Sequence, residues 1–226
     1  MNNSLCFEDW GRIEYTKALA LQKQRVEELV RAPDKNYLIF CEHDSVITLG
    51  RGTLREETFV SGDIPSINVE RGGLATYHGP GQLVGYPILK LSPKSESICP
   101  GGIRELVCIM EKSIIELLSA YNIKAESIPK KTGVWIGGQR KIASIGIAVS
   151  HWVSYHGFAL NISTNKEHWK FINPCGFSSG IMTNLQDETN LPIDFVRIKG
   201  QLKEILISKL EPSGLRQSNL ASEFAL

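Results

Sequence analysis

Two residues of this sequence have types and surroundings that suit covalent chemistry. Cys175 stands between a proline and a glycine, in a stretch typical of a turn, whereas Cys41 and Cys108 lie in apolar runs as structural cysteines do. A cysteine attacks as the thiolate, which a nearby ammonium group stabilises. Lys141 is the candidate for that cation, and it could also exchange protons with a leaving or an incoming group.

Lys141 lies near the start of a predicted strand. Strict alternation along that strand places Lys141 on the same face as the apolar residues Ala143, Ile145, Ile147 and Val149. Lysine is rarely buried unless it is paired, so this position is unusual. The alternative is that Lys141 lies at the strand end and extends its ammonium group into solvent.

A glycine-rich stretch, R-G-G-L-A-T-Y-H-G-P-G-Q-L-V-G-Y-P-I from Arg71 to Ile88, could line a binding site. It holds five glycines, one arginine and one histidine, and no acidic residue. Glycines let the backbone approach another molecule closely. The stretch lacks the G-K-[ST] of a phosphate loop and the G-x-G-x-x-G spacing of a dinucleotide site. A glycine-rich turn around a buried tyrosine is the alternative, which local composition alone favours.

Hydrophobic periodicity predicts the elements that must position these residues. Helices are expected over about 11–31, over 103–121 with Asn122 as a cap, and after Asp194, which caps the last helix. Strands are expected at 37–42, 46–49, 66–69, 83–88, 133–136, 140–150 and 153–162. The Gly137-Gly138 pair predicts a hairpin turn.

Loops are expected elsewhere, at 71–82, at 91–102 and around Cys175. His43 and Asp44 are expected in a turn between the first two strands. On the last strand, alternation predicts that His156, Phe158, Leu160 and Ile162 share a face. The result is an α/β chain, a mixed sheet with packed helices in one domain over 1–226, with a mobile tail from about 212.

Composition narrows the function classes. The 226 residues are 42% hydrophobic and 22% charged, with a net charge of +1, which does not favour nucleic acid as a partner. There are five cysteines without a C-x-x-C pair, and neither they nor the five histidines have zinc-site spacing, so no metal is expected. No signal peptide or membrane span is evident. These features predict a cytoplasmic protein with reduced thiols.

Four ordered blocks resemble the lipoyl (octanoyl) transferase family, a match that runs from about Asn36 to the last helix. The blocks are Arg71–Gln82 (RGGLATYHGPGQ), Lys141–Gly146 (KIASIG), His156–Asn161 (HGFALN) and Ile172–Gly176 (INPCG). The resemblance implies the α/β catalytic domain shared with biotin protein ligases and lipoate ligases. It also implies an octanoyltransferase that moves octanoyl from acyl carrier protein to a lysine of a lipoyl-domain protein, the first step of protein lipoylation.

By the same resemblance, Cys175 is the acyl-accepting nucleophile and Lys141 its catalytic partner. The implied substrate-binding residues come from three of the blocks: Arg71, Gly72, Gly73, Leu74, Ala75, Thr76, Tyr77, His78, Ser144, Ile145, Gly146, Gly157, Phe158 and Ala159. The implied acceptors are the lipoyl domains of 2-oxoacid dehydrogenase E2 subunits and the glycine cleavage H protein. No cofactor is expected, and we expect a monomer that binds neither membrane nor nucleic acid.

Three alternatives stand beside this prediction. An ATP-dependent lipoate-protein ligase of the same fold would need no cysteine nucleophile, and an octanoyl amidotransferase would move acyl groups between lipoyl domains. A catalytically inactive carrier-binding module is the alternative outside enzymes, which an intact Cys175 and Lys141 disfavour. The sequence departs from the family in the E-H-D-S-V turn and in the segment 91–102, and both departures concern the rim of the site.

Overall fold

The structure is a computed structural model and describes residues 4–53, 64–91, 102–172 and 179–211. Its helices and strands follow in the order β1 (Ser4–Ile13), α1 (Tyr15–Arg31), β2 (Lys35–His43), β3 (Val46–Leu49), β4 (Ser66–Asn68), β5 (Ala75–His78), β6 (Gln82–Ile88), α2 (Ile103–Ser119), β7 (Ala125–Ile128), β8 (Lys131–Ile136), β9 (Arg140–Ser150), β10 (Val153–Asn161), the 3₁₀ helices η2 (Lys166–Phe171) and η4 (Ser179–Ile181), α3 (Leu185–Glu188) and α4 (Phe195–Leu210).

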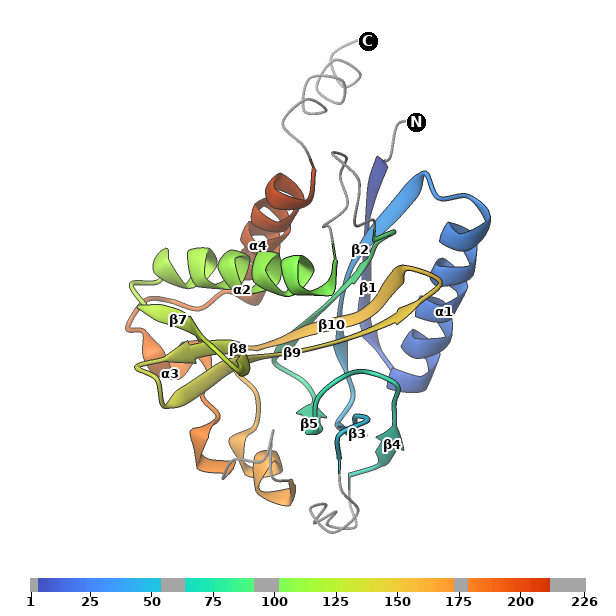
Figure 1. The fold of residues 1–226 in the computed structure, drawn as a ribbon. Coiled ribbons are helices and arrows are strands. Elements are labelled where there is room, and N and C mark those ends of the chain that lie inside the picture. Colours follow the sequence, from blue (N-terminus) through green and yellow to red (C-terminus); the bar gives the residue numbers. More distant parts are fainter. Residues whose placement is uncertain (1–3, 54–63, 92–101, 173–178, 212–226) are drawn as a thin grey trace.

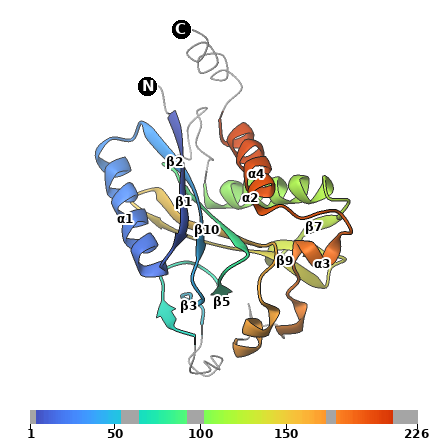
Figure 2. The ribbon, with the colours of Figure 1, turned by 180° about the vertical axis from the view of Figure 1, so that it is seen from behind.

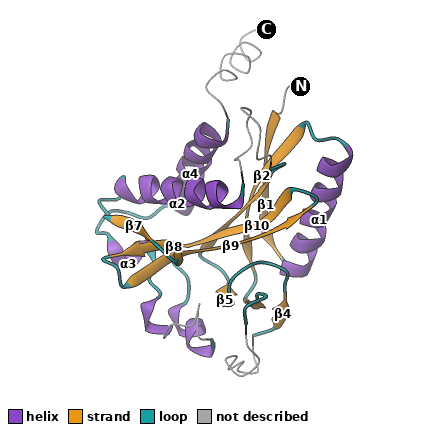
Figure 3. Cartoon of the chain, in the orientation of Figure 1, coloured by secondary structure: helices purple, strands orange, loops and turns teal. Residues whose placement is uncertain are grey.

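A mixed sheet forms the centre of the fold. Its order is β1-β2-β6-β10-β9-β8-β7, with β1 parallel to β2 and every other neighbouring pair antiparallel. A smaller sheet in the order β4-β3-β5 lies beside it (Figures 1 and 3). This arrangement confirms the predicted α/β class, because helices and strands interleave without strict βαβ alternation.

Helices cover both faces of the large sheet. On one face α2 and α4 bury Leu106, Met110, Leu202 and Leu206 against the sheet residues Phe40 and Phe158. On the other face α1 contributes Val26 and Leu29 to a second core with Ile39 and Tyr86. Figures 1 and 2 show the two layers from opposite sides. The central strands β2, β6 and β10 are therefore buried on both faces, as their near-continuous apolar sequences require.

The helix ends follow the local sequence. Asp194 accepts hydrogen bonds from the N–H groups of Val196 and Arg197, which confirms it as the cap of α4. At the end of α2, Asn122 has a φ of 60°, its N–H donates to Ser119 O and that of Ile123 donates to Leu118 O. These two bonds form a Schellman motif, so the predicted cap at Asn122 is confirmed.

Three predicted boundaries were wrong. The first helix begins at Tyr15 with Glu14 as its cap, because residues 4–13 form β1 alongside β2. The stretch from Arg71 to Gln82 is not all loop, since β5 pairs antiparallel with β3. His43 ends β2 and is fully buried, so it does not lie in an exposed turn. In each case pairing with a distant strand decides the conformation, which local composition does not report.

The strands that carry the predicted chemistry are correctly placed. β8 and β9 form a hairpin, and its turn residues Gly137 and Gly138 have φ of 56° and 68°. Positive φ at both central positions is the type I′ geometry that suits the twist of a hairpin. The expected segments 91–102 and 171–176 lie largely, and the tail from 212 wholly, outside the described residues.

Three histidines form a polar cluster between α1 and the sheet. His43 donates through Nδ1 to Ile13 O at 2.8 Å and accepts from the Tyr86 hydroxyl at Nε2 at 2.6 Å. His78 donates to Gln82 Oε1 at 2.8 Å, and Tyr15 stacks on its ring. Burial lowers the pKa of His43 and, far more, that of His78. It lowers the pKa of His156 to about 3, with the charge of Arg71 acting in the same direction.

Acid should therefore destabilise this fold before its carboxylates titrate fully. An unfolded histidine binds a proton near its ordinary pKa of about 6.5, whereas His156 stays neutral down to about 3. The stabilisation is complete above pH 6.5 and is lost as the pH falls toward 3, by at most about 1.4 kcal/mol per pH unit for each histidine. Urea unfolding between pH 7 and pH 4 measures it.

The matched control is a pair of single substitutions. His156→Gln should flatten part of the pH dependence, because glutamine cannot bind the proton. His151→Gln, at an exposed turn position, should leave the curve unchanged. A free energy of unfolding that is equally pH-dependent in wild type and His156→Gln would contradict the assignment.

Candidate functional site

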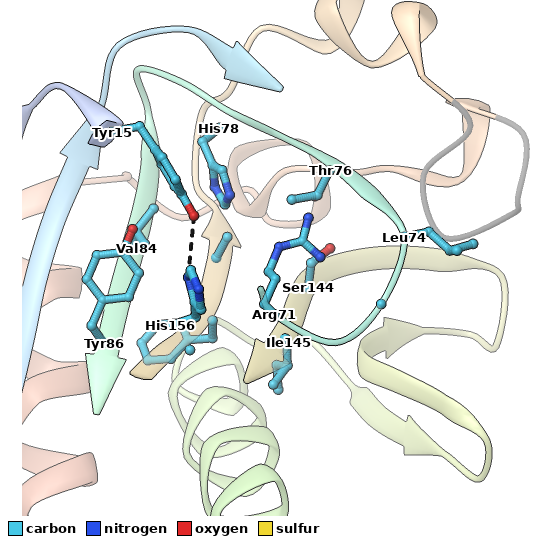
Figure 4. Close-up of a pocket in the computed structure, with 15 residues that line it drawn as sticks. Tyr15, Arg71, Leu74, Thr76, His78, Val84, Tyr86, Ser144, Ile145 and His156 are labelled. Atoms are coloured by element: carbon cyan, nitrogen blue, oxygen red, sulfur yellow. Dashed lines mark hydrogen bonds between the residues drawn. The ribbon is translucent and has the colours of Figure 1, made fainter. Parts of the chain in front are cut away.

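A pocket lies where the glycine-rich stretch crosses the middle of the sheet. The space that water-sized spheres can occupy in it is about 40 Å³, and all of its atom-free space, open solvent included, is about 460 Å³. Its walls come from α1, the segment 71–74, β5, β6, β9 and β10. The lining residues are Tyr15, Arg71, Gly73, Leu74, Thr76, His78, Val84, Tyr86, Ser144, Ile145, Gly146, His156, Gly157, Phe158 and Ala159 (Figure 4).

Arg71 holds the glycine-rich segment in place. Its Nη2 donates to Thr48 O at 2.9 Å and to Thr48 Oγ1 at 2.8 Å, and its Nη1 donates to Gly72 O at 3.1 Å. The N–H of Gly72 donates to Ile147 O at 3.0 Å, which ties the segment to β9. These bonds keep the guanidinium, only 7% exposed, at the pocket wall.

One glycine on β9 makes this crossing possible. A Cβ on Gly146 would lie 2.8 Å from Gly72 O and 3.1 Å from Arg71 Cδ. Real Cβ atoms do not approach a carbonyl oxygen that closely, so any larger residue at 146 would push the segment off the sheet. The glycine content of the blocks is therefore explained by close backbone approach.

A second side of the pocket is built around His156. Its φ is 58°, which turns its side chain toward α1, where the ring Nδ1 lies 3.4 Å from the Tyr15 hydroxyl (Figure 4). Its N–H donates to Gln22 Oε1 at 2.8 Å. Phe158 and Leu160 instead pack under α2 and α4. The predicted shared face is thus wrong for His156, because positive φ interrupts the alternation.

Most of the lining agrees with the residues that the family resemblance implies. Eleven of the fourteen predicted residues line the pocket. Gly72 contributes backbone contacts, Ala75 packs into the core of the smaller sheet, and the Tyr77 hydroxyl bonds Ser45 and His168. Tyr15, Val84, Tyr86 and His156 were missed. Two signals were available in the sequence. Tyr15 is a tyrosine on the apolar stripe of the first helix, and His156 is the first residue of the block His156–Asn161.

Several buried polar atoms of the lining have no hydrogen-bond partner among the described residues. They are Thr76 Oγ1, Ser144 Oγ and His156 Nε2. Buried polar groups are normally satisfied by protein, water or a bound molecule. The two hydroxyls come from β5 and β9 and are available to a polar group that enters the pocket.

Lys141 is buried, at 2% exposure, so the solvent-extended alternative is wrong. The register of β9 against β8 shifts: Lys141 lies opposite Trp135, and Ala143 lies opposite Val134. Because two residues of β9 span one step of β8, Ile142 forms a bulge and Lys141 faces the side opposite to Ala143. The predicted face was therefore also wrong, and the bulge is the reason.

The surroundings of Lys141 are an aromatic ring, a glycine and the returning chain. Its Nζ lies 5.2 Å from the centre of the Trp135 ring, a cation–π arrangement. A Cβ on Gly133 would lie 2.7 Å from Lys141 Cε, so only glycine leaves room for the lysine stem. Lys141 O accepts from the N–H of Thr183 at 3.1 Å, and Lys141 bridges to Met182.

Cys175 lies outside the described residues, which stop at Ile172 and resume at Ser179. No cluster of three or more metal-ligating side chains occurs within the described ranges. None of the helices in those ranges is long and apolar enough to cross a membrane.

Comparison with known proteins identifies the family. The model of the lipoyl protein ligase A/B catalytic domain matches residues 14–207. The octanoyltransferase of Parabacteroides distasonis is 38% identical over 220 residues, covering 90% of this chain and 97% of that protein. That of Porphyromonas gingivalis is 38% identical over 216 residues, and the match covers 88% of this chain but only 43% of that longer protein.

Solved structures support the fold. A bipartite lipoate protein ligase from Thermoplasma acidophilum superposes with a TM-score of 0.68 at 17% identity, over 90% of this chain and 82% of that one. The biotin protein ligase of Aquifex aeolicus in complex with biotin and ATP gives 0.50 at 12% identity, over 92% and 70%. The chain belongs to the lipoyl protein ligase A/B catalytic domain family and is a transferase enzyme related to the octanoyltransferases.

Proposed function

We propose that this protein transfers an octanoyl group from the thioester of acyl carrier protein, through Cys175, to a lysine of a lipoyl-domain protein. The observation that carries the proposal is the burial of Lys141 on β9, beside the bulge at Ile142, where it forms a β-bridge with Met182 on the chain that follows the Cys175 segment. A buried ammonium group is rare among lysines, so this position is a candidate for a functional role.

The chemistry balances without a cofactor. The Cys175 thiolate attacks the thioester carbonyl, the carbon–sulfur bond to the carrier breaks, and Lys141 protonates the departing thiolate. The amine of the acceptor lysine then attacks the acyl-cysteine, the new amide forms, and Lys141 takes up the proton as Cys175 leaves. Exchange between thioesters is nearly balanced and amide formation is downhill, so ATP is not required.

The pocket suits an acyl chain. Val84, Ile145, Phe158 and Ala159 line it with apolar surface. An octanoyl tail has about seven carbons beyond its carbonyl, each worth roughly 0.8 kcal/mol when buried, so such a slot can select for chain length. The free hydroxyls of Thr76 and Ser144 are donors for the carbonyl oxygen as negative charge develops on it.

Two alternative enzyme activities can be distinguished from this proposal by experiment. An ATP-dependent ligase has the same fold, so dependence of the activity on ATP separates the two. Transfer from octanoyl-acyl carrier protein would distinguish this protein from an amidotransferase, which takes its acyl group from another lipoyl domain. We assign the acceptor role to lipoyl domains, including those of 2-oxoacid dehydrogenases and the glycine cleavage H protein. We also propose a cytoplasmic monomer with one catalytic domain.

A covalent intermediate is the first expected result. Mixing the protein with octanoyl-carrier thioester should add one octanoyl mass, located by peptide mapping at Cys175. Cys175→Ala should give no adduct, and Cys175→Ser should not support transfer. Cys41→Ala, at a buried cysteine of β2 whose pKa is raised by burial, should keep the adduct. An undiminished adduct in Cys175→Ala would sink the thioester route.

The role of Lys141 is tested by keeping its charge and changing its acidity. Lys141→Arg retains a cation that cannot readily release a proton, so transfer should fall by about 10²- to 10⁴-fold. Lys141→Met removes the charge as well and should slow iodoacetamide labelling of Cys175 at neutral pH. Steady-state transfer rates and labelling rates, measured with thermal unfolding as the folding control, separate the two effects. Wild-type transfer by Lys141→Arg would leave Lys141 no proton-transfer role.

Carrier docking is tested by charge reversal at the rim. Lys130 is exposed next to Lys131, whose Nζ lies 5.5 Å from the same Trp135 ring that Lys141 contacts. Arg140 is instead paired with Glu188. Acyl carrier proteins are typically acidic, so Lys130→Glu should lower kcat/KM for the carrier, most strongly at low salt. Lys17→Glu, exposed on α1, is the control; equal effects of the two substitutions would count against docking at this rim.

A further inference from the structure

Glu111 on α2 is a half-buried carboxylate that the proposed mechanism does not use. Its Oε1 accepts a hydrogen bond from the Gly133 N–H at 3.0 Å. Gly133 lies where the register of β7 against β8 shifts, between the pairs Glu126–Trp135 and Ile128–Lys131. A bulge leaves a residue out of the regular ladder, and Glu111 gives the N–H of this residue an acceptor.

Gly133 in turn is the residue that packs against the end of Lys141. A Cβ added to Gly133 would lie 2.7 Å from Lys141 Cε and 3.4 Å from Nζ. The φ of Gly133 is 124°, which disfavours any side chain as well. Gly133 therefore donates its N–H to the Glu111 carboxylate and packs against the end of the Lys141 side chain.

Glu111 and Lys141 also interact electrostatically. Burial raises the pKa of Glu111, while the Gly133 N–H and the charge of Lys141 act in the opposite direction. The neighbouring elements β8, β9 and α3 also carry the charged residues Lys131, Arg140 and Glu188. Lys131 shares the Trp135 ring, whereas Arg140 and Glu188 are joined by hydrogen bonds of 2.7 and 2.9 Å. Glu188 is therefore already paired with a cation, Arg140.

We propose that Glu111 is a positioning residue for Lys141. It holds Gly133 against the lysine stem through the hydrogen bond, and its negative charge favours the ammonium form that donates a proton to the leaving thiolate. The proposal rests on the proposed role of Lys141 in acyl transfer. Glu111 would thus act across β8 on Lys141, whereas the apolar residues of α2 pack in the core.

The two parts of this role separate by substitution. Glu111→Gln keeps an acceptor oxygen for Gly133 and removes the charge, whereas Glu111→Ala removes both. Glu116→Gln is the matched control, because it removes a carboxylate from an exposed position of the same helix. The rate of acyl-enzyme formation is measured by mass spectrometry against pH for each variant.

For Glu111→Gln, we expect the alkaline limb of that profile to move to lower pH by about half a unit to one unit, because an ammonium without its carboxylate neighbour loses its proton more easily. KM for the carrier should stay unchanged. Glu111→Ala should show the same shift and a lower maximal rate, and Glu116→Gln should follow the wild type. A Glu111→Gln profile that superimposes on the wild-type profile overturns the proposal, as does a fall in rate without a shift.

A readout that needs no transfer activity tests the coupling independently. In a Cys175→Ala background, acetic anhydride labels neutral amines, and labelling of Lys141 is compared with that of exposed Lys124 in the same sample. Glu111→Gln should raise this ratio about three- to tenfold at neutral pH. An unchanged ratio refutes the coupling even if transfer proceeds. A raised ratio in this background, together with a wild-type Cys175 protein that forms no acyl-enzyme, supports the coupling and rejects the proposed function.

Discussion

Burial of the Lys141 ammonium is the constraint around which this end of the sheet is organised. A lysine enters a protein interior only where partners compensate its lost hydration. Two irregularities lie beside it: the register of β7 against β8 shifts in the stretch that contains Gly133, and the register of β8 against β9 shifts at Ile142. The second irregularity turns Lys141 away from the apolar face under α2 and toward the ring of Trp135. A regular hairpin would have placed this cation in the hydrophobic core.

Close backbone contact is the second principle of the site. The segment 71–74 lies directly on β9, bound through Gly72 to Ile147 and made possible by Gly146. At the other strand, a Cβ on Gly157 would lie 2.1 Å from Gly85 O. These glycines bring a wall of polar backbone and an arginine over strands that are otherwise apolar. The pocket thus joins an apolar slot to a few fixed hydrogen-bonding groups, the usual character of small-molecule sites.

The side chains of Tyr15, His43, His78 and His156 form a connected polar cluster at the inner side of the pocket. Each of these side chains bonds or stacks on another, and burial keeps all three imidazoles neutral near pH 7. Neutral rings bury at lower cost than charged ones and hold defined tautomers. The same family fold is found in lipoate and biotin ligases, so the fold itself does not decide between chemistries that use ATP and those that use a thioester. That decision lies with particular side chains.

The resemblance to the family pointed to eleven residues of the pocket. The sequence by itself determined the class of fold, the Gly137–Gly138 hairpin, and the last two long helices with their caps Asn122 and Asp194. These features are local, because periodicity, capping and turn chemistry act within a few residues. Tertiary structure alone decided the face of Lys141 and that of His156, because a bulge and a positive φ break an alternation that local pattern assumes to be regular. It alone also brought Tyr15 to the pocket and Glu111 to Gly133, since side chains far apart in sequence meet only through the packing of α1 and α2 on the sheet.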